Sequence, residues 1–137
     1  MSGNASDGQV FHWPVTVYWE DTDASGVVYH ANYLRWMERA RTEWLRAQGF
    51  EQAALAEQLG IGFTISDLQM RFIKPARLDD TLQVQVEVAR QRRVSLEFVQ
   101  RVVKNDSEAL LATARVAVAC VRLRDFRPAK LPLLAKK

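Results

Sequence analysis

The chain has 137 residues, of which 48% are hydrophobic and 26% charged, and this composition is typical of one soluble globular domain spanning residues 1–137. Its 19 basic and 16 acidic residues leave a net charge of +3, which is too small to indicate a nucleic-acid-binding protein. We find no run of 18 apolar residues and no apolar leader, so we expect a cytoplasmic protein without a transmembrane segment. The single cysteine, Cys120, cannot form an internal disulfide and is expected to be a buried thiol.

The first half of the chain predicts one strand and one long helix. Residues 1–9 are small and polar, and we expect them to be flexible. Alternating apolar residues predict a strand over residues 10–19, with Val17 and Trp19 on one face. Residues 31–48 then carry apolar side chains at steps of three and four, which predicts an amphipathic helix about 25 Å long. These side chains are Tyr33, Leu34, Trp36, Met37, Ala40, Trp44 and Ala47.

The second half of the chain predicts a short helix followed by strands. The helix covers residues 51–59 and ends at Gly60. Residues 122–137 contain two prolines and several lysines, so we expect an irregular end that is flexible over residues 129–137. Between these segments, a period of two predicts four strands, over residues 67–72, 82–88, 94–103 and 110–121.

This order of elements predicts an α+β fold. One antiparallel sheet, with its last four strands in a meander, should curl around the long helix. A single helix covers one sheet face at most, and residues 110–121 are apolar on both faces. We therefore expect a second copy of the chain to cover the other face, which makes the protein at least a dimer.

The segment Glu20–Tyr33 joins the first strand to the long helix and holds two carboxylates, a glycine turn and a histidine. Its letters DTDASG resemble the opening of an EF-hand calcium loop. The twelfth position of such a loop should be glutamate, whereas this chain has Asn32, and an EF-hand loop follows a helix rather than a strand. The calcium-loop interpretation is therefore rejected.

A transition-metal site is the second interpretation of this segment. It would combine the two carboxylates with two histidines that are eighteen residues apart, and no third soft ligand is nearby. This is a weak signal, so we predict no metal. The residues considered as ligands are His12, Asp21, Asp23 and His30.

Carboxylate catalysis at a helix N-terminus is the third interpretation. The first amides of the helix beginning near His30 lack intrahelical partners and carry partial positive charge, so they could stabilise an oxyanion. Gly26 allows a substrate carbonyl to approach the backbone. Asp23 or Asp21 could then attack a thioester or deprotonate water, and spacing alone does not separate the two. Asp residues before a helix are more often only caps or turn residues.

The same segment also resembles the motif of a known family. That motif has Thr or Cys, Asp, two residues, Gly, Ile or Val, Val, any residue, His or Phe, two residues, and Phe or Tyr. The chain resembles the hotdog-fold acyl-CoA thioesterases of the hydroxybenzoyl-CoA thioesterase type, in particular their tol-pal-associated, YbgC-like branch. The flanks VYWEDTDASGVVYHANY and MERARTEWLR, and KPARLDD further on, extend the resemblance to about Val121. Every motif position is filled, by Thr22, Asp23, Gly26, Val27, Val28, His30 and Tyr33.

The resemblance implies a hotdog fold of five to six antiparallel strands around one long helix, and hydrolysis of an acyl-CoA to free acid and CoA. It implies that Asp23 is the nucleophile or general base, that the backbone N–H of His30 contacts the oxyanion, and that the His30 side chain orients substrate or water. Arg92 and Arg93 occupy a predicted turn and are candidates for the CoA phosphates, although an ordinary basic turn is equally plausible. The other expected substrate-binding residues are Gly26, Val27, Val28, Tyr29 and Tyr33.

The resemblance also bears on partners and alternatives. It implies no cofactor, since CoA is part of the substrate, and a homodimer or homotetramer with its site at the subunit interface. Acyl groups on acyl carrier protein are a second substrate class. One alternative is a 3-hydroxyacyl thioester dehydratase using His30 and Glu43, and another is a scaffold that binds acyl carrier protein or envelope-assembly partners without catalysis.

Overall fold

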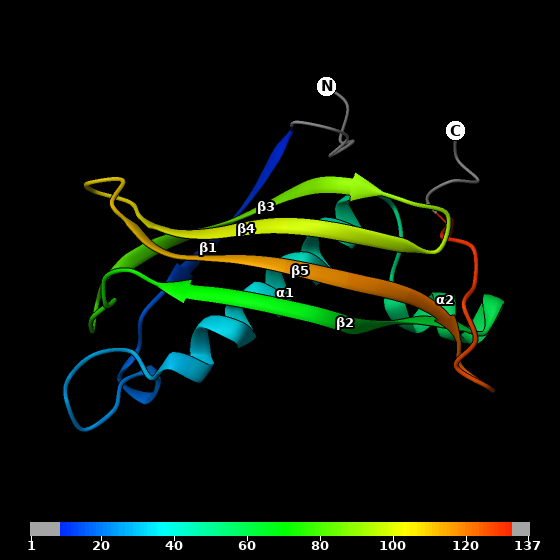
Figure 1. Cartoon of the computed structure of the whole chain (residues 1–137). Coiled ribbons are helices and arrows are strands. Elements are labelled where there is room, and N and C mark those ends of the chain that lie inside the picture. The colour runs from blue at the N-terminus through cyan, green and yellow to red at the C-terminus, as the bar shows by residue number, and fades with distance from the viewer. Residues whose placement is uncertain (1–8, 133–137) are drawn as a thin grey trace.

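In the computed structural model, one antiparallel sheet of five strands curls around a single long helix (Figure 1). The structure describes residues 9–132, so the predicted flexible residues 1–8 and 133–137 lie outside the described part. The predicted α+β arrangement is confirmed. The strands are β1 (Val10–Thr16), β2 (Ile61–Phe72), β3 (Thr81–Gln91), β4 (Ser95–Lys104) and β5 (Leu110–Arg122), and the helices are α1 (His30–Ala47), α2 (Gln52–Leu59) and the 3-10 turn η1 (Trp19–Asp21).

The strand order across the sheet is β1-β3-β4-β5-β2, and every neighbouring pair is antiparallel. Strands β3, β4 and β5 form the predicted meander. The prediction is wrong for β2, which pairs with β5 and not with β3. Alternation with a period of two identifies a strand but does not say which strand pairs with it. The link over residues 73–80 is long enough to place β2 at the edge of the sheet, with β4 and β5 between it and β3.

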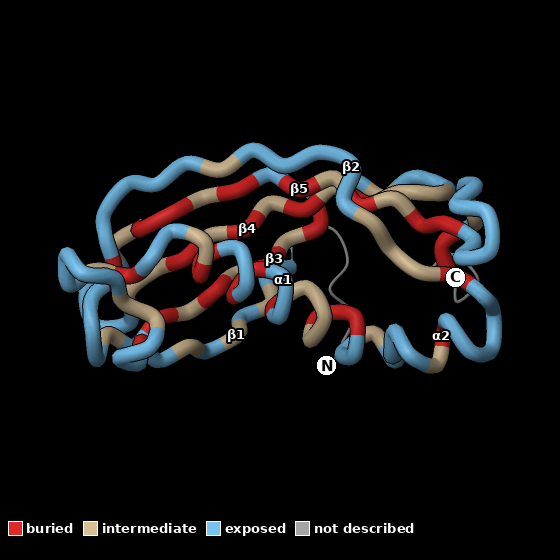
Figure 2. Tube along the Cα trace, turned by 90° about the horizontal axis from the view of Figure 1, so that it is seen from below, coloured by how far each residue is buried: buried red, intermediate tan, exposed pale blue. Residues whose placement is uncertain are grey.

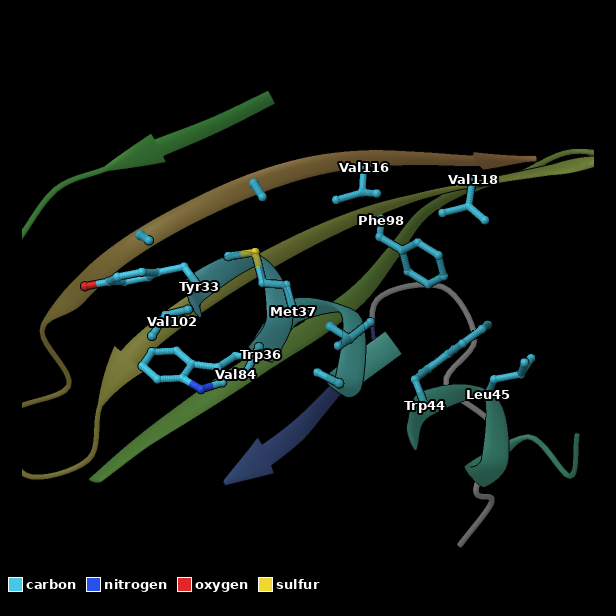
Figure 3. Packing of buried hydrophobic residues seen from close by; sticks show 14 of the residues in the cluster. Tyr33, Trp36, Met37, Trp44, Leu45, Val84, Phe98, Val102, Val116 and Val118 are labelled. Atoms are coloured by element: carbon cyan, nitrogen blue, oxygen red, sulfur yellow. The ribbon is translucent and has the colours of Figure 1, made fainter. Parts of the chain in front are cut away.

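Helix α1 lies on the concave side of the curved sheet (Figure 2). The strand order makes β1 and β2 the two edge strands. The buried face of α1 is the predicted stripe, with Met37 and Ala40 at its centre. Leu34 and Ala47 were also predicted to be buried, but both are exposed because they lie at the margins of the stripe. Figure 3 shows the packing of the stripe against the sheet, between Tyr33, Trp36, Met37, Trp44 and Leu45 of α1 and Val84, Phe98, Val102, Val116 and Val118 of the strands.

Two strand boundaries differ from the prediction. Strand β1 ends at Thr16, because the Val17 N–H donates to Asp80 O at 2.9 Å and the chain then enters η1. Trp19 is therefore 80% exposed instead of lying in a strand face. Strand β2 begins at Ile61, earlier than predicted, and a bulge between Ile65 and Asp67 changes its phase, which hides the alternation in the sequence.

The end of the described chain packs against the sheet. The Ala129 N–H donates to Cys120 O and the Leu131 N–H donates to Arg93 O, each at 2.9 Å, and Leu131 is 1% exposed. The prediction of a flexible end from residue 129 is therefore wrong for residues 129–131. Cys120 is buried, as predicted, and its burial raises the pKa of the thiol.

The outer face of β5 is less apolar than the sequence suggested. Its helix-facing side carries buried valines, whereas Ala117 and Ala119 on the other side are half-buried and Arg115 is exposed. This face therefore requires no second cover, and the predicted dimer needs another argument. None of the helices in residues 9–132 is long and apolar enough to cross a membrane.

Candidate active site

A tight turn between η1 and α1 presents Asp23. Thr22 and Val28 face each other in an isolated bridge, and within the turn the Asp23 N–H donates to Val27 O at 2.9 Å. The Gly26 N–H donates to Asp23 O at 3.0 Å, and Gly26 has a φ of +86°. Glycine adopts this left-handed conformation at low cost, so Gly26 allows the chain to reverse directly after Asp23.

The Asp23 carboxylate is exposed and held by Ser25. Its Oδ1 accepts hydrogen bonds from the Ser25 hydroxyl and from the Ser25 N–H, the latter at 2.8 Å. These two bonds are the main reasons that the pKa of Asp23 is lowered from its ordinary value, and the charge of His30 lowers it further. The carboxylate is therefore ionised at neutral pH, as a nucleophile or a general base must be.

Helix α1 begins at His30 with an uncapped N-terminus. Its N-cap residue, Tyr29, makes no side-chain hydrogen bond to the helix, and its first turn contains no acidic residue. Within residues 9–132 the N–H groups of His30 and Ala31 donate no hydrogen bond. These free amides lie at the positive end of the helix dipole, so they form a site for an anionic oxygen.

Asp21 has a structural role that separates it from Asp23. Its Oδ2 accepts a hydrogen bond from the Tyr18 N–H at 2.9 Å, which fixes the start of η1. Its backbone oxygen accepts from the Tyr29 N–H and from Nδ2 of Asn32, both at 2.9 Å. The capping role expected of an Asp in this segment thus belongs to Asp21, and it serves η1 rather than α1.

An apolar cavity of about 260 Å³ adjoins the first turn of α1. The His30 ring is edge-on to Phe72 at a centroid distance of 6.2 Å, and the buried ring of Tyr33 is edge-on to the same Phe72 at 5.3 Å. The cavity brings together three residues predicted from the sequence and four that were not, the latter from the end of β2 and the residues that follow. Its lining residues are Val28, His30, Tyr33, Phe72, Ile73, Lys74 and Pro75.

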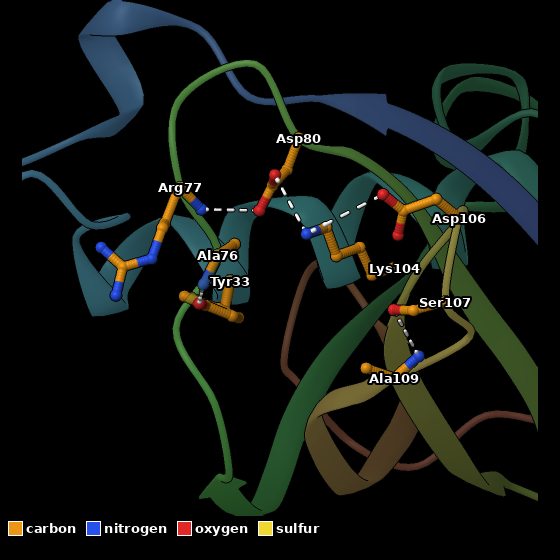
Figure 4. A network of polar contacts seen from close by, with 8 residues as sticks. All are labelled: Tyr33, Ala76, Arg77, Asp80, Lys104, Asp106, Ser107 and Ala109. Atoms are coloured by element: carbon orange, nitrogen blue, oxygen red, sulfur yellow. Dashed lines mark hydrogen bonds and ion pairs between the residues drawn. The ribbon is translucent and has the colours of Figure 1, made fainter.

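The link over residues 73–80 holds the site in place. The Tyr33 hydroxyl accepts a hydrogen bond from the Ala76 N–H at 2.9 Å (Figure 4). The Val28 N–H donates to Ala76 O at 2.9 Å. Asp80 accepts from the Arg77 N–H at 2.9 Å and lies 3.6 Å from the Lys104 ammonium. Tyr33 is 3% exposed, and this burial raises the pKa of its hydroxyl. Its hydroxyl is therefore engaged with the link, while its ring lines the cavity.

The roles of the residues in this link were not assigned from the sequence, although a signal was available. The sequence KPARLDD at residues 74–80 contributes to the family resemblance. In the structure this segment lies against α1 and the turn that carries Asp23. Val27 forms an isolated bridge with Arg77, so the turn and the link pair directly. Tyr29 is exposed, and its ring lies 4.6 Å from that of His30.

Other predicted residues lie far from Asp23. Strand β3 begins at Thr81, near the turn, and ends just before Arg92 and Arg93, so these arginines are roughly 30 Å away along the strand in the same chain (Figure 1). His12 is exposed on β1, opposite Gln85. Within residues 9–132 no group of three or more His, Cys, Asp or Glu side chains could hold a metal ion.

Comparisons with known proteins identify the family. Residues 17–135 match the model of the thioesterase-like superfamily. The acyl-CoA thioester hydrolase YbgC of Escherichia coli O6:H1 is 47% identical over 123 residues, which are 90% of this chain and 90% of that protein. The acyl-CoA thioesterase YbgC of Haemophilus influenzae is 44% identical over 122 residues, which are 89% of this chain and 88% of that protein.

A solved structure gives the same result for the fold. The crystal structure of a probable thioesterase from Bartonella henselae has a TM-score of 0.83 and 32% identity, and the match covers 90% of this chain and 99% of that chain. The sheet wrapped around α1 is the predicted hotdog fold. The chain therefore belongs to the thioesterase-like superfamily and, within it, to the YbgC family, which confirms the resemblance seen in its motif.

Proposed function

We propose that this chain hydrolyses acyl-CoA thioesters, with Asp23 as the catalytic carboxylate and the N-terminus of α1 as the oxyanion site. One observation carries the proposal: an exposed, ionised carboxylate lies in the turn that leads into the uncapped helix N-terminus. The relatives that share this chain's length and family are acyl-CoA thioesterases. Acyl groups on acyl carrier protein remain a second substrate class for the same chemistry.

Two routes use these groups, and both end with a carboxylic acid and a thiol. In the first, Asp23 attacks the thioester carbon, the thiolate leaves, and water hydrolyses the resulting anhydride to regenerate the carboxylate. In the second, Asp23 takes a proton from water, the hydroxide attacks, and the departing thiolate receives the proton. In each route the N–H groups of His30 and Ala31 stabilise the oxyanion as negative charge develops on the carbonyl oxygen.

We propose that the working enzyme is a homodimer. Strand β2 is an edge strand whose side chains Ile65, Leu68 and Phe72 are 38% to 50% exposed, and such an edge is a surface for pairing with another chain. Phe72 also lines the cavity beside His30, so a second copy on this edge would border the site. Because Arg92 and Arg93 lie at the far end of their own chain, we propose that they reach the CoA phosphates of the partner's site.

The deciding experiment measures thiol release from a panel of acyl-CoAs by the wild type, Asp23→Asn and Asp21→Asn. Asp23→Asn removes the nucleophile or base and should lower kcat by about 10²–10⁴-fold. Asp21→Asn is the matched control, because its side chain accepts a hydrogen bond from Tyr18 and an amide oxygen can do the same. Full turnover by Asp23→Asn would exclude Asp23, and no release from any acyl-CoA would redirect the assay to acyl carrier protein substrates.

The geometry does not favour the dehydratase alternative. It requires His30 and Glu43 to act together, but these residues are thirteen positions apart on α1, or about 20 Å. Glu43 instead accepts a hydrogen bond from Arg46 at 2.6 Å.

The other alternative is a non-catalytic scaffold. Such a scaffold would bind acyl carrier protein equally well in the wild type and Asp23→Asn, and neither protein would release thiol.

A further inference from the structure

Asn32 is a buried amide in the first turn of α1, where it is 5% exposed. Within residues 9–132, Gln100 is the only other buried residue with an amide or a charged side chain. An amide is costly to bury unless both its N–H and its C=O groups are paired. The partners of Asn32 therefore indicate what this residue does.

Both ends of the Asn32 side chain are paired. Its Nδ2 donates to the backbone oxygen of Asp21 at 2.9 Å, and its Oδ1 accepts from Nη1 of Arg35 at 2.9 Å. A backbone oxygen can only accept and a guanidinium can only donate, so these partners fix which end of the amide is which. Arg35, three residues later on α1, therefore holds the amide with its N–H group toward Asp21.

The bond from Asn32 to Asp21 belongs to a set that fixes the start of α1. The same Asp21 oxygen accepts from the Tyr29 N–H at 2.9 Å, and Tyr29 O accepts from the Asn32 N–H at 2.9 Å. The two residues between Tyr29 and Asn32 are those whose free N–H groups form the proposed oxyanion site. Asp23 follows Asp21 by two residues. These bonds therefore set where the free amides lie relative to the Asp23 carboxylate.

We propose that Asn32 is a positioning residue for thioester hydrolysis, which fixes the oxyanion amides at their working distance from Asp23. Because it is buried and engaged at both ends, it acts through the backbone of Asp21 and does not touch the substrate. A displacement of about 1 Å between a catalytic group and the reacting carbon can lower the rate about 100-fold. This role rests on the proposed function, because it requires an oxyanion at the helix N-terminus.

The test measures kcat and KM of thiol release for the wild type, Asn32→Leu and Gln100→Leu. Leucine has nearly the shape of asparagine but cannot donate to Asp21 O. Asn32→Leu should therefore lower kcat about 10- to 100-fold and leave KM within about twofold, since substrate binding is untouched.

Gln100→Leu is the matched control for a general loss of stability. The Gln100 amide is also buried, accepts from Arg41 at 2.9 Å and donates to a backbone oxygen, that of Met37, at 3.0 Å. Its loss should lower the free energy of unfolding as Asn32→Leu does, and both are measured by urea denaturation. Because Gln100 lies on β4, away from the turn, its kcat should stay within about twofold of the wild type.

Arg35→Met tests the same role if Asn32→Leu fails to fold. Arg35 is exposed, and its loss leaves the Asn32 amide free to turn away from Asp21. The kcat of this variant should fall about threefold or more at constant KM. Arg39→Met, one turn further along the exposed face of α1, should change neither parameter.

Three results would overturn the role of Asn32. The first is full kcat in Asn32→Leu, or in Arg35→Met where the former does not fold. The second is an equal fall of kcat in Asn32→Leu and Gln100→Leu, which would trace the effect to stability. The third is a raised KM with unchanged kcat, which would place the altered residue in substrate binding. No thiol release by the wild type would instead overturn the proposed function, and this role with it.

Discussion

Ser25 determines how basic the Asp23 carboxylate is. Both hydrogen bonds from Ser25 stabilise the charged form, so they are the main reason that the pKa of Asp23 is low, and the charge of His30 adds a smaller effect. A carboxylate with a lowered pKa remains ionised in mildly acidic solution. Such a carboxylate is a weaker base. Thioester hydrolysis does not require a strong base, because the thiolate is a good leaving group.

We therefore expect Ser25→Ala to move the acid limb of the kcat/KM profile to higher pH. Loss of the hydroxyl removes the strongest stabilisation of the Asp23 carboxylate, so its pKa rises and protonation abolishes activity at a higher pH. Steady-state thiol release measured across acidic pH checks this. Ser25→Thr retains the hydroxyl and should keep the wild-type limb. An unchanged limb in Ser25→Ala would show that another group titrates.

The sequence could not distinguish Asp23 from Asp21 by spacing, because both precede the helix by a few residues. The distinction depends on which donors each carboxylate meets. Asp21 meets the Tyr18 amide after the strand has already ended, and this early end is not visible in the alternation of residues 10–19. The family motif favours Asp23, both carboxylates accept a bond from a nearby backbone N–H, and the choice between them stays a prediction for the Asp23→Asn and Asp21→Asn assays.

At the level of the elements, the link over residues 73–80 connects the turn, α1 and the start of β3. Its central contact is the hydrogen bond from the fully buried Ala76 N–H to the Tyr33 hydroxyl. Tyr33→Phe leaves this donor buried and unpaired, so the free energy of unfolding should fall by about 1–3 kcal/mol. Urea denaturation followed by circular dichroism measures the change.

Tyr29→Phe is the matched control for this prediction. Tyr29 is exposed, so loss of its hydroxyl should alter the free energy of unfolding by no more than about 0.5 kcal/mol. Equal stability of Tyr33→Phe and the wild type would mean that water or a shifted link replaces the lost acceptor. Lower kcat in Tyr33→Phe is also expected, since the same link lines the cavity beside His30.

The long helix was predictable because one apolar stripe with a period near four continues for its whole length. Strand β2 was predictable only in part. Its bulge after Ile65 exchanges the inward and outward positions, so no single alternating pattern covers the strand. Residues 73–77 of the link carry no periodicity at all, and their role depends on backbone groups, which a sequence does not display.

For the whole molecule, the proposed dimer rests on the exposed edge of β2. Leu68→Asp places a charge on this edge, and it should separate a dimer into monomers because an unpaired charge is costly inside an interface. Size-exclusion chromatography with light scattering should give twice the mass of one chain for the wild type and a single mass for the variant. Gln69→Asp, on the opposite face of β2, should remain dimeric. A monomeric wild type would contradict the proposed dimer.

The position of β2 beside β5 also shows what sequence alone leaves open. Each strand was found from its own residues, but neighbours depend on which apolar faces fit together around α1. The short connections between β3, β4 and β5 restrict those strands to hairpins, and the longer link does not restrict β2 in this way.

The strand order has a consequence for how the protein folds. Strands β3, β4 and β5 are continuous in sequence over residues 81–122, so they can pair through short loops before any distant segment arrives. The turn that carries Asp23 depends on contacts between distant parts of the chain, such as Val28 with Ala76 and Val17 with Asp80. We therefore expect catalytic competence to be the last property gained during folding and the first lost when the protein begins to unfold.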